Sequence, residues 1–438
     1  MNAATLRLLL RPAPGSTGVV VIPAVAFAVV SALVLTVVGG AQAFWSWTDQ
    51  EALIYQVLAA VALVLLVLPL AALGGAAARL SARRRDERLS TLRLLGVTGF
   101  GVGVVAVVES TLVAVVGVLG GVLLAFGLAP LVGLIPFRGE PLGSAVLLAP
   151  WMMAAIAAGT VLLATISAVI GLRRVVISPL GVRTRSTPPT PHWVRAVIAI
   201  AAVAAGFAAG WVVPGIGGAI AVITGLVAIF GVGLLVLNLI GPWVLKIGAR
   251  MQLRRAKTPA RLLAARIVLD DPKGTWRQVS GVAMSSFMAV FAGTGVALMN
   301  VMSSSDPSAQ DLALLTDMRT GLIITLVASF LMVGCSVAVT QASDIIDQRD
   351  LHRSLHYLGV PGATVDAARR RAVMSPLLIT ALGSALCAAV LIFPLLGIAL
   401  ITAPLSLVTI AAVLTAGIAL VWMATRLTRP LLMRAFAG

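Results

Sequence analysis

The chain has 438 residues, of which 60% are apolar and only 11% are charged, and its formal net charge is +17. A soluble chain of this length cannot bury so much apolar surface, even when it divides into several cores. The composition therefore excludes an ordinary soluble enzyme and predicts a protein that lies within a lipid bilayer.

Ten apolar runs follow one another along the chain, each close to the roughly 20 residues that a helix needs to cross the hydrocarbon. They cover residues 18–38, 53–75, 103–127, 147–171, 195–213, 216–241, 278–299, 320–340, 373–395 and 402–424. Because lipid offers no partner to backbone polar groups, each run is expected to be a helix. The predicted fold class is all-α, a polytopic transmembrane helix bundle.

The first run follows Arg7 and Arg11 and precedes Ala41-Gln42-Ala43, an arrangement that also occurs in secretory signal peptides. At about 20 residues it is longer than the 7–15 residues of a typical signal core. It also has a counterpart in the second half of the chain. We therefore interpret it as the first membrane span, with a cleaved signal as the alternative.

The basic residues predict the topology. When both termini are cytoplasmic, ten spans place 30 of the 32 Lys and Arg on the cytoplasmic side, and only Arg138 and Arg319 on the other. This distribution obeys the positive-inside rule and predicts a multi-pass protein of the plasma membrane. Orientation and contact with anionic lipid headgroups account for the charge, so no nucleic-acid partner is expected.

The expected outer loops are short and cover residues 39–52, 128–146 and 300–319. None of them is long enough to form an extracellular domain. The first loop contains Phe44, Trp45 and Trp47, which we expect to anchor the chain at the membrane interface. A ligand contact by these aromatic residues is the alternative.

Few residues carry reactive chemistry. Cys335 and Cys387 lie within predicted spans and are interpreted as packing residues. The three histidines, His192, His352 and His356, lack the spacing of metal ligands. The sequence contains no phosphate-binding loop and no hydrolase motif, so no catalytic, metal or cofactor site is expected in this chain.

Two stretches on the basic side resemble each other. Residues 83–99 and 346–362 align under a shift of 263 positions, which places Leu92 on Leu355 and Gly96 on Gly359. Each stretch follows one apolar run and precedes another, so two parallel four-helix halves are expected. The predicted domains are a first half over 1–180, a Pro-rich linker with two connecting helices over 181–254, and a second half over 255–438.

Both repeated stretches predict a short amphipathic helix that ends at a glycine suited to a left-handed C-cap. Acidic residues among the bases weaken attraction to anionic lipid and favour a protein surface as the partner. The alternative is a helix that only rests on headgroups. The residues singled out are Arg84, Arg85, Asp86, Glu87, Arg88, Leu89, Leu92 and Gly96 in the first stretch, and Asp350, Leu351, Leu355, Leu358 and Gly359 in the second.

Polar residues within the spans are few. Glu109 is the only carboxylate inside a predicted span, where burial costs about 2.5–3.5 kcal/mol. We expect it near the inner boundary, paired with an arginine or a backbone group; substrate contact or proton relay is the alternative. Asn238 is expected to form an interhelical hydrogen bond. Close helix packing is expected at Gly117, Gly120, Gly121, Gly225, Gly231 and Gly233.

With these motifs the sequence resembles the FtsX-like permease family, the MacB-type class of ATP-binding-cassette transporters. The resemblance is carried by Arg83 to Glu87, by Leu89, Leu92, Leu94 and Gly96, by Glu109-Ser110, and by Ser178-Pro179-Leu180. In the second half, His356 stands in place of Arg93 and Ala372 in place of Glu109. The arrangement of the ten spans as four, two and four is similar to that of the peptide-antibiotic-resistance permeases, without their large extracellular domain.

The resemblance implies a permease that moves its substrate with ATP and Mg²⁺ bound on separate cytoplasmic ATPase subunits. Two ATPase copies would dock on residues 81–95 and 344–358. The expected function is export or extraction of a lipid, lipopeptide or membrane-active antibiotic. One alternative is a signalling component that transmits ATP hydrolysis to a cell-envelope partner. The other is an ion-coupled carrier, for which the spans contain few carboxylates.

Overall fold

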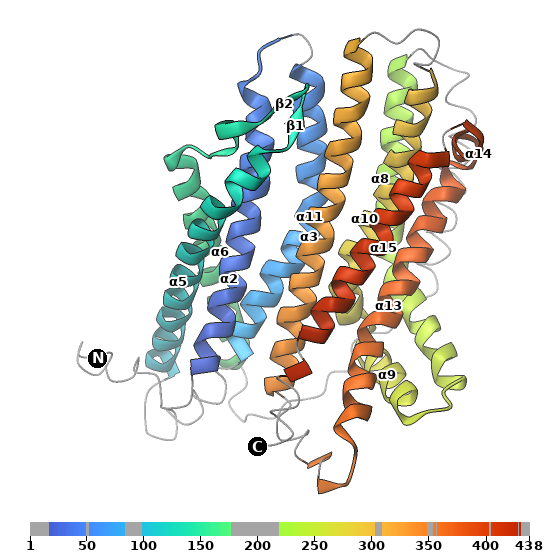
Figure 1. Ribbon diagram of the computed structural model, residues 1–438. Coiled ribbons are helices and arrows are strands. Elements are labelled where there is room, and N and C mark those ends of the chain that lie inside the picture. The colour runs from blue at the N-terminus through green and yellow to red at the C-terminus, as the bar shows by residue number, and fades with distance from the viewer. Residues whose placement is uncertain are drawn as a thin grey trace. The chain divides into compact units, whose positions relative to one another are not determined.

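The computed structural model describes residues 17–49, 52–83, 99–176, 219–302, 309–347, 354–355, 357–402, 404–427 and 429–430. This part of the chain is almost entirely helical, so the predicted all-α fold class is confirmed (Figure 1). Eight helices within it are long and apolar enough to cross a membrane. The chain is therefore a polytopic membrane protein, and its internal contacts divide it into two compact units.

Nine of the ten predicted spans coincide with helices, and the remaining one, 195–213, lies outside the described residues. The helices are α2 (Thr17–Gln42), α3 (Ala52–Arg83), α5 (Gly99–Gly133), α6 (Pro150–Val176), α8 (Ala219–Arg254), α10 (Pro272–Met302), α11 (Ala309–Asp347), α13 (Gly362–Leu391) and α15 (Pro404–Leu427). Several continue well beyond the apolar run, as in α11 with 39 residues. Such lengths exceed the roughly 20 residues of a span, so their ends extend past the hydrocarbon.

Unit 1 contains Met1–Leu63, Leu70–Ser186 and Cys335–Arg349. Within it, α2 packs along α5, and α6 packs against α5. Two glycines one turn apart on α5 permit the close approach of α2. A Cβ at Gly117 would lie 2.5 Å from the carbonyl oxygen of Ala24, and one at Gly121 would lie 2.6 Å from that of Ala28. Small residues four apart on both helices let the backbones touch, as expected for packing in lipid.

The other glycines differ in their surroundings. A Cβ at Gly120 would be in ordinary contact with the Ala28 Cβ at 3.6 Å, and one at Gly233 would overlap the Phe287 ring. Close packing is therefore confirmed at both. At Gly231, no atom of the described neighbours lies within 4 Å of a Cβ, so close packing is not found there among the described residues. The surroundings of Gly225 lie outside the described side chains.

A small cap covers one end of unit 1 (Figure 1). It consists of the 3-10 helices η1 (Ala43–Ser46) and η2 (Gly143–Val146) and a hairpin of β1 (Pro136–Phe137) and β2 (Glu140–Pro141). Phe137 pairs with Glu140, so only Arg138 and Gly139 form the loop. Their φ angles are 54° and 80°. Two consecutive positive φ angles define the type I′ turn that favours tight hairpins.

Unit 2 contains Val64–Pro69, Thr187–Gly334 and Asp350–Gly438. Its central helix is α10, which packs against α8, α13 and α15. Phe287 of α10 is fully buried against Ala388 and Leu391 of α13. The α10–α13 pair corresponds to the α2–α5 pair of unit 1, because in each half the first long helix packs along the third long helix. In addition, α5 and α13 begin 263 positions apart, at Gly99 and Gly362.

The predicted interhelical hydrogen bond of Asn238 is confirmed. The Trp276 Nε1 of α10 donates to the Asn238 Oδ1 of α8 at 3.0 Å. Gly241 makes room for the indole, since a Cβ there would overlap the Trp276 ring. The bond satisfies the two polar groups where α8 meets α10, which lipid could not do.

Unit 2 contains two further short helices that were not predicted as separate elements. A short helix, α9 (Pro259–Asp270), precedes α10 and lies near one end of α8 and α13 (Figure 1). At the other end, α13 stops at Leu391 rather than near 395, and α14 (Phe393–Thr402) follows, seen nearly end-on in Figure 1. At the break, Ile392 leaves the helical region, with φ −111° and ψ 25°. Pro394 then occupies the first turn of α14, where its missing N–H costs nothing.

Candidate functional site

Most of the predicted coupling residues lie outside the described part of the chain. This holds for Arg84, Arg85, Asp86, Glu87, Arg88, Leu89, Leu92 and Gly96 in residues 84–98, and for Asp350 and Leu351 in residues 348–353. Leu355, Leu358 and Gly359 are described, together with Glu109. The candidate site is therefore the end of the second segment and the helix that follows it.

The second segment ends in a glycine cap. The Val360 N–H donates to the Leu355 carbonyl oxygen at 3.0 Å, five residues back, and Gly359 has a φ of 76°. This is the Schellman arrangement, in which a glycine takes the left-handed conformation and the following amide closes the helix end. The predicted left-handed C-cap at Gly359 is confirmed.

Two large apolar side chains project from this cap. Tyr357 is 79% exposed and Leu358 is 78% exposed, whereas Leu355 is half-buried. The chain then turns at Pro361, whose carbonyl oxygen accepts from the Thr364 N–H at 2.9 Å, and α13 begins at Gly362. Only three residues, 359–361, separate the exposed pair from α13. A displacement of the pair would thus pass to α13 through a short connection.

The first turns of α13 contain a buried carboxylate that the sequence analysis did not single out. Asp366 is 3% exposed and lies 3.3 Å from the Arg369 Nη2 and 3.3 Å from the Arg370 Nε. Arg429, beyond the end of α15, approaches the same carboxylate at 3.9 Å. Three guanidinium groups therefore converge on one acid, and they join the start of α13 to the segment after α15.

This cluster was missed because the predicted span began at residue 373, which left 366–371 as a basic loop. The available signal was the spacing: Asp366, Arg369 and Arg370 stand at i, i+3 and i+4, where helical side chains meet. Arg429 carries no such signal, since its proximity follows from the packing of α15 on α13.

Glu109 lies half-buried in α5, beside the buried Ser110. Helix α5 begins at Gly99 with an apolar stretch, so Glu109 stands ten residues into the helix. Its expected place near the inner boundary of the membrane stays a prediction.

The cap of unit 1 contains the second charged cluster. The Arg138 Nη1 donates to the Asp49 Oδ2 at 2.5 Å. The same guanidinium stacks on the rings of Trp47 and Tyr55, with centroid distances of 4.3 Å and 4.7 Å. A backbone hydrogen bond at Asp49 itself, and then the bond from Arg138, lower the pKa of Asp49 below its ordinary value of 3.8. The cap therefore joins the segment between α2 and α3 to the segment between α5 and α6, by an ion pair and by ring stacking.

The aromatic residues of the first loop, which are expected to anchor the chain at the membrane interface, form a cluster in the cap. Phe44 and Trp47 contact each other edge-to-face at 5.2 Å and also pack against Tyr55. Phe44 contacts Phe137 of the hairpin at 5.0 Å. Of the three predicted anchors, Trp45 alone is exposed, at 49%. The Arg138 guanidinium lies over the rings of Trp47 and Tyr55 and adds a cation–π attraction to this cluster.

Within the described residues, no three His, Cys, Asp or Glu side chains are grouped so that they could hold a metal ion. Cys335 and Cys387 are half-buried free thiols in α11 and α13. No family model, curated protein or solved structure matches the chain. The candidate site therefore consists of the charged start of α13 around Asp366 and the exposed pair Tyr357 and Leu358 that precedes it.

Proposed function

We propose that this polytopic membrane protein is the permease subunit of an FtsX-like ATP-binding-cassette transporter. It would export or extract a hydrophobic or amphipathic molecule, while separate cytoplasmic subunits hydrolyse ATP. The observation that carries the proposal is the exposed pair Tyr357 and Leu358, set on a glycine cap that leads directly into α13.

The exposed pair has the chemistry of an anchor for a protein groove. Each side chain would gain roughly 1.5–3 kcal/mol on full burial. Tyrosine is enriched among the residues that dominate binding at protein interfaces. The acids and bases on the preceding residues, such as Asp344 and Arg349, would supply polar contacts around the pair. A cytoplasmic ATPase with an apolar groove fits this combination.

The link to transport is mechanical. Closure of the docked ATPases would displace the pair, and the three residues 359–361 would pass that movement to α13. The start of α13 is held by Asp366 and its three arginines, including Arg429 beyond α15. A push on this end would therefore move α13 together with the segment that follows α15.

The test is purification of the tagged full chain from its own cells after mild crosslinking. The expected result is an ATPase of the cassette class at two copies per chain, by native mass. The variant Tyr357→Ala/Leu358→Asp should lose about half of this ATPase while its membrane insertion is unchanged. Leu312→Asp is the matched control, since Leu312 is an exposed leucine at the start of α11. Nucleotide hydrolysis by the isolated chain, or full retention of ATPase by the double variant, would refute the proposal.

A further inference from the structure

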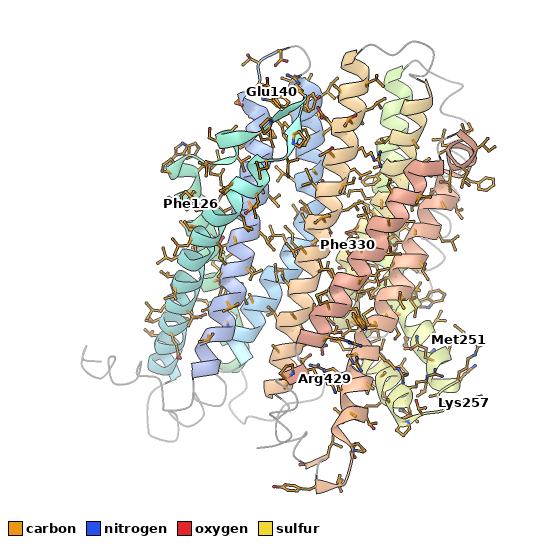
Figure 2. All side chains as sticks on the ribbon, viewed as in Figure 1. Phe126, Glu140, Met251, Lys257, Phe330 and Arg429 are labelled. Atoms are coloured by element: carbon orange, nitrogen blue, oxygen red, sulfur yellow. The ribbon has the colours of Figure 1, made fainter. Side chains whose placement is uncertain are left out.

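The end of α8 and the helix α9 form a surface that the proposed function does not use. This surface, the α8–α9 corner, comprises Ile247–Arg254, the connecting residues 255–258, and α9. Figure 2 shows Met251 and Lys257 in it, at the same end of unit 2 as Arg429. It lies on the side of the chain where the basic residues gather.

The charge of the corner is almost purely positive. Between residues 250 and 270 the chain has six basic side chains and a single acid, Asp270. All seven are exposed; the bases are Arg250, Arg254, Arg255, Lys257, Arg261 and Arg266. The mixed-charge segment 344–358 differs from this pattern, since it interleaves three acids, Asp344, Asp347 and Asp350, with its bases. A surface with few acids suits a partner of uniform negative charge.

Exposed apolar side chains stand among these bases. Ile247 and Met251 on α8 are 40% and 50% exposed, and Leu262 and Ile267 on α9 are 49% and 46% exposed. Ile247 and Met251 belong to the same apolar span as Leu235, which is 66% exposed. Ile247 and Met251 stand four positions apart, so they share one face of α8 at its basic end. Apolar residues flanked by Lys and Arg are the pattern of helices that lie in the membrane interface.

The other face of α9 holds the corner in place. Ala264 and Val268 are buried against Ala249 of α8 and Ala372 of α13. Alanine lets the helices approach closely, so α9 is fixed to the bundle before any ligand arrives. A fixed helix loses little conformational entropy on binding, which favours affinity.

We infer that the α8–α9 corner is a binding surface for the headgroups of anionic phospholipids. The guanidinium and ammonium groups would contact the phosphates, and the apolar side chains would enter the boundary with the acyl chains. A protein partner is disfavoured here because the bases lack the interleaved acids of segment 344–358. Phosphate is also a good bidentate partner for arginine.

The first test compares lipids on the full chain in zwitterionic detergent. Added phosphatidylglycerol should raise the apparent unfolding temperature more than phosphatidylcholine does, and soluble glycerol phosphate at the same concentration should have no effect. In Arg255→Gln/Arg261→Gln/Arg266→Gln the concentration of phosphatidylglycerol required should rise about a hundredfold, from roughly fivefold per charge. An unchanged requirement, or an equal effect of glycerol phosphate, would overturn the inference.

A second measurement does not depend on the charge variant. A fluorescent label at Ile267→Cys, in a chain whose two native cysteines are replaced by serine, should be quenched by brominated phosphatidylglycerol in nanodiscs. The same label at Tyr357→Cys should be quenched much less. The charge variant should also keep any bound ATPase, so failure of this inference is distinguishable from failure of the proposed function. Loss of ATPase with the lipid preference intact would show that a protein occupies the corner, and would refute the lipid assignment.

Discussion

Replacing Asp366 by alanine is expected to destabilise unit 2 strongly, because it leaves arginines at a buried position without their acid. The side chains of Asp366 and Arg369 are only 4% and 11% exposed. Breaking a buried ion pair by removing one partner costs about 3–5 kcal/mol. In the pair between Asp366 and Arg429, the Arg429 side chain is 62% exposed. Removal of Arg429 is therefore expected to cost about 0–1 kcal/mol.

The exposures therefore predict an order that an experiment can check. The free energy of unfolding would be measured by SDS titration of the protein in mixed micelles, for Asp366→Ala, Arg429→Ala and the control Glu140→Ala at an exposed carboxylate. The expected loss is large for the first, small for the second and negligible for the control. Adding Arg369→Ala to Asp366→Ala should recover part of the loss, because the most buried of the three arginines is then removed together with the acid.

The reasoning would be refuted by two results. One is that Arg429→Ala lowers the free energy of unfolding as much as Asp366→Ala does. This would mean that side-chain exposure does not predict how much each ion pair stabilises the protein. The other is additivity of Asp366→Ala and Arg369→Ala, which would mean that the two side chains do not act as a pair.

Three further outcomes are expected from the same unfolding assay. Gly121→Leu should separate α2 from α5 and lower the free energy of unfolding by several kcal/mol. A Cβ at Gly127 has no described neighbour within 4 Å, so Gly127→Ala should be neutral or stabilise by up to about 1 kcal/mol. Equal effects of the two substitutions would contradict the packing argument. The pKa of Asp49 is lowered in the fold, so its stabilisation is present above pH 3.8 and lost as pH falls further. Wild type and Asp49→Asn should thus differ at neutral pH and converge in acid, and a constant difference would count against the ion pair. Asn238→Leu should cost about 1 kcal/mol by leaving the Trp276 N–H without an acceptor, and Trp276→Phe in that background should cost little more.

The sequence predicted the spans well because lipid imposes one simple requirement on every segment, a long apolar helix. The same logic identified Asn238 and most of the close-packed glycines, since polar and small residues in a span have few other uses. Gly359 was predictable for a local reason, because a helix end followed by Gly-Val-Pro favours the left-handed cap.

The features that were missed depend on contacts between distant segments. Asp366 was assigned to a loop because hydropathy averages over a window and cannot show that a helix begins before its apolar part. The stacking of Arg138 on Trp47 joins two residues that are 91 positions apart in the chain. Helix α9 has 12 residues, too few to be recognised as a span. Its alanine face matters only once α8 and α13 are adjacent.

The glycine contact between α2 and α5 has an evolutionary consequence. A substitution at Gly117 or Gly121 would need a compensating change in the backbone path of α2, which no single mutation supplies. Selection should therefore hold both glycines, and should admit only small residues at Ala24 and Ala28. Gly127 and Gly231, which have no described neighbour within 4 Å of a Cβ, should vary freely among relatives of this chain. The helix pair would thus appear in a set of homologues as four small positions that never enlarge, amid apolar residues that exchange with one another.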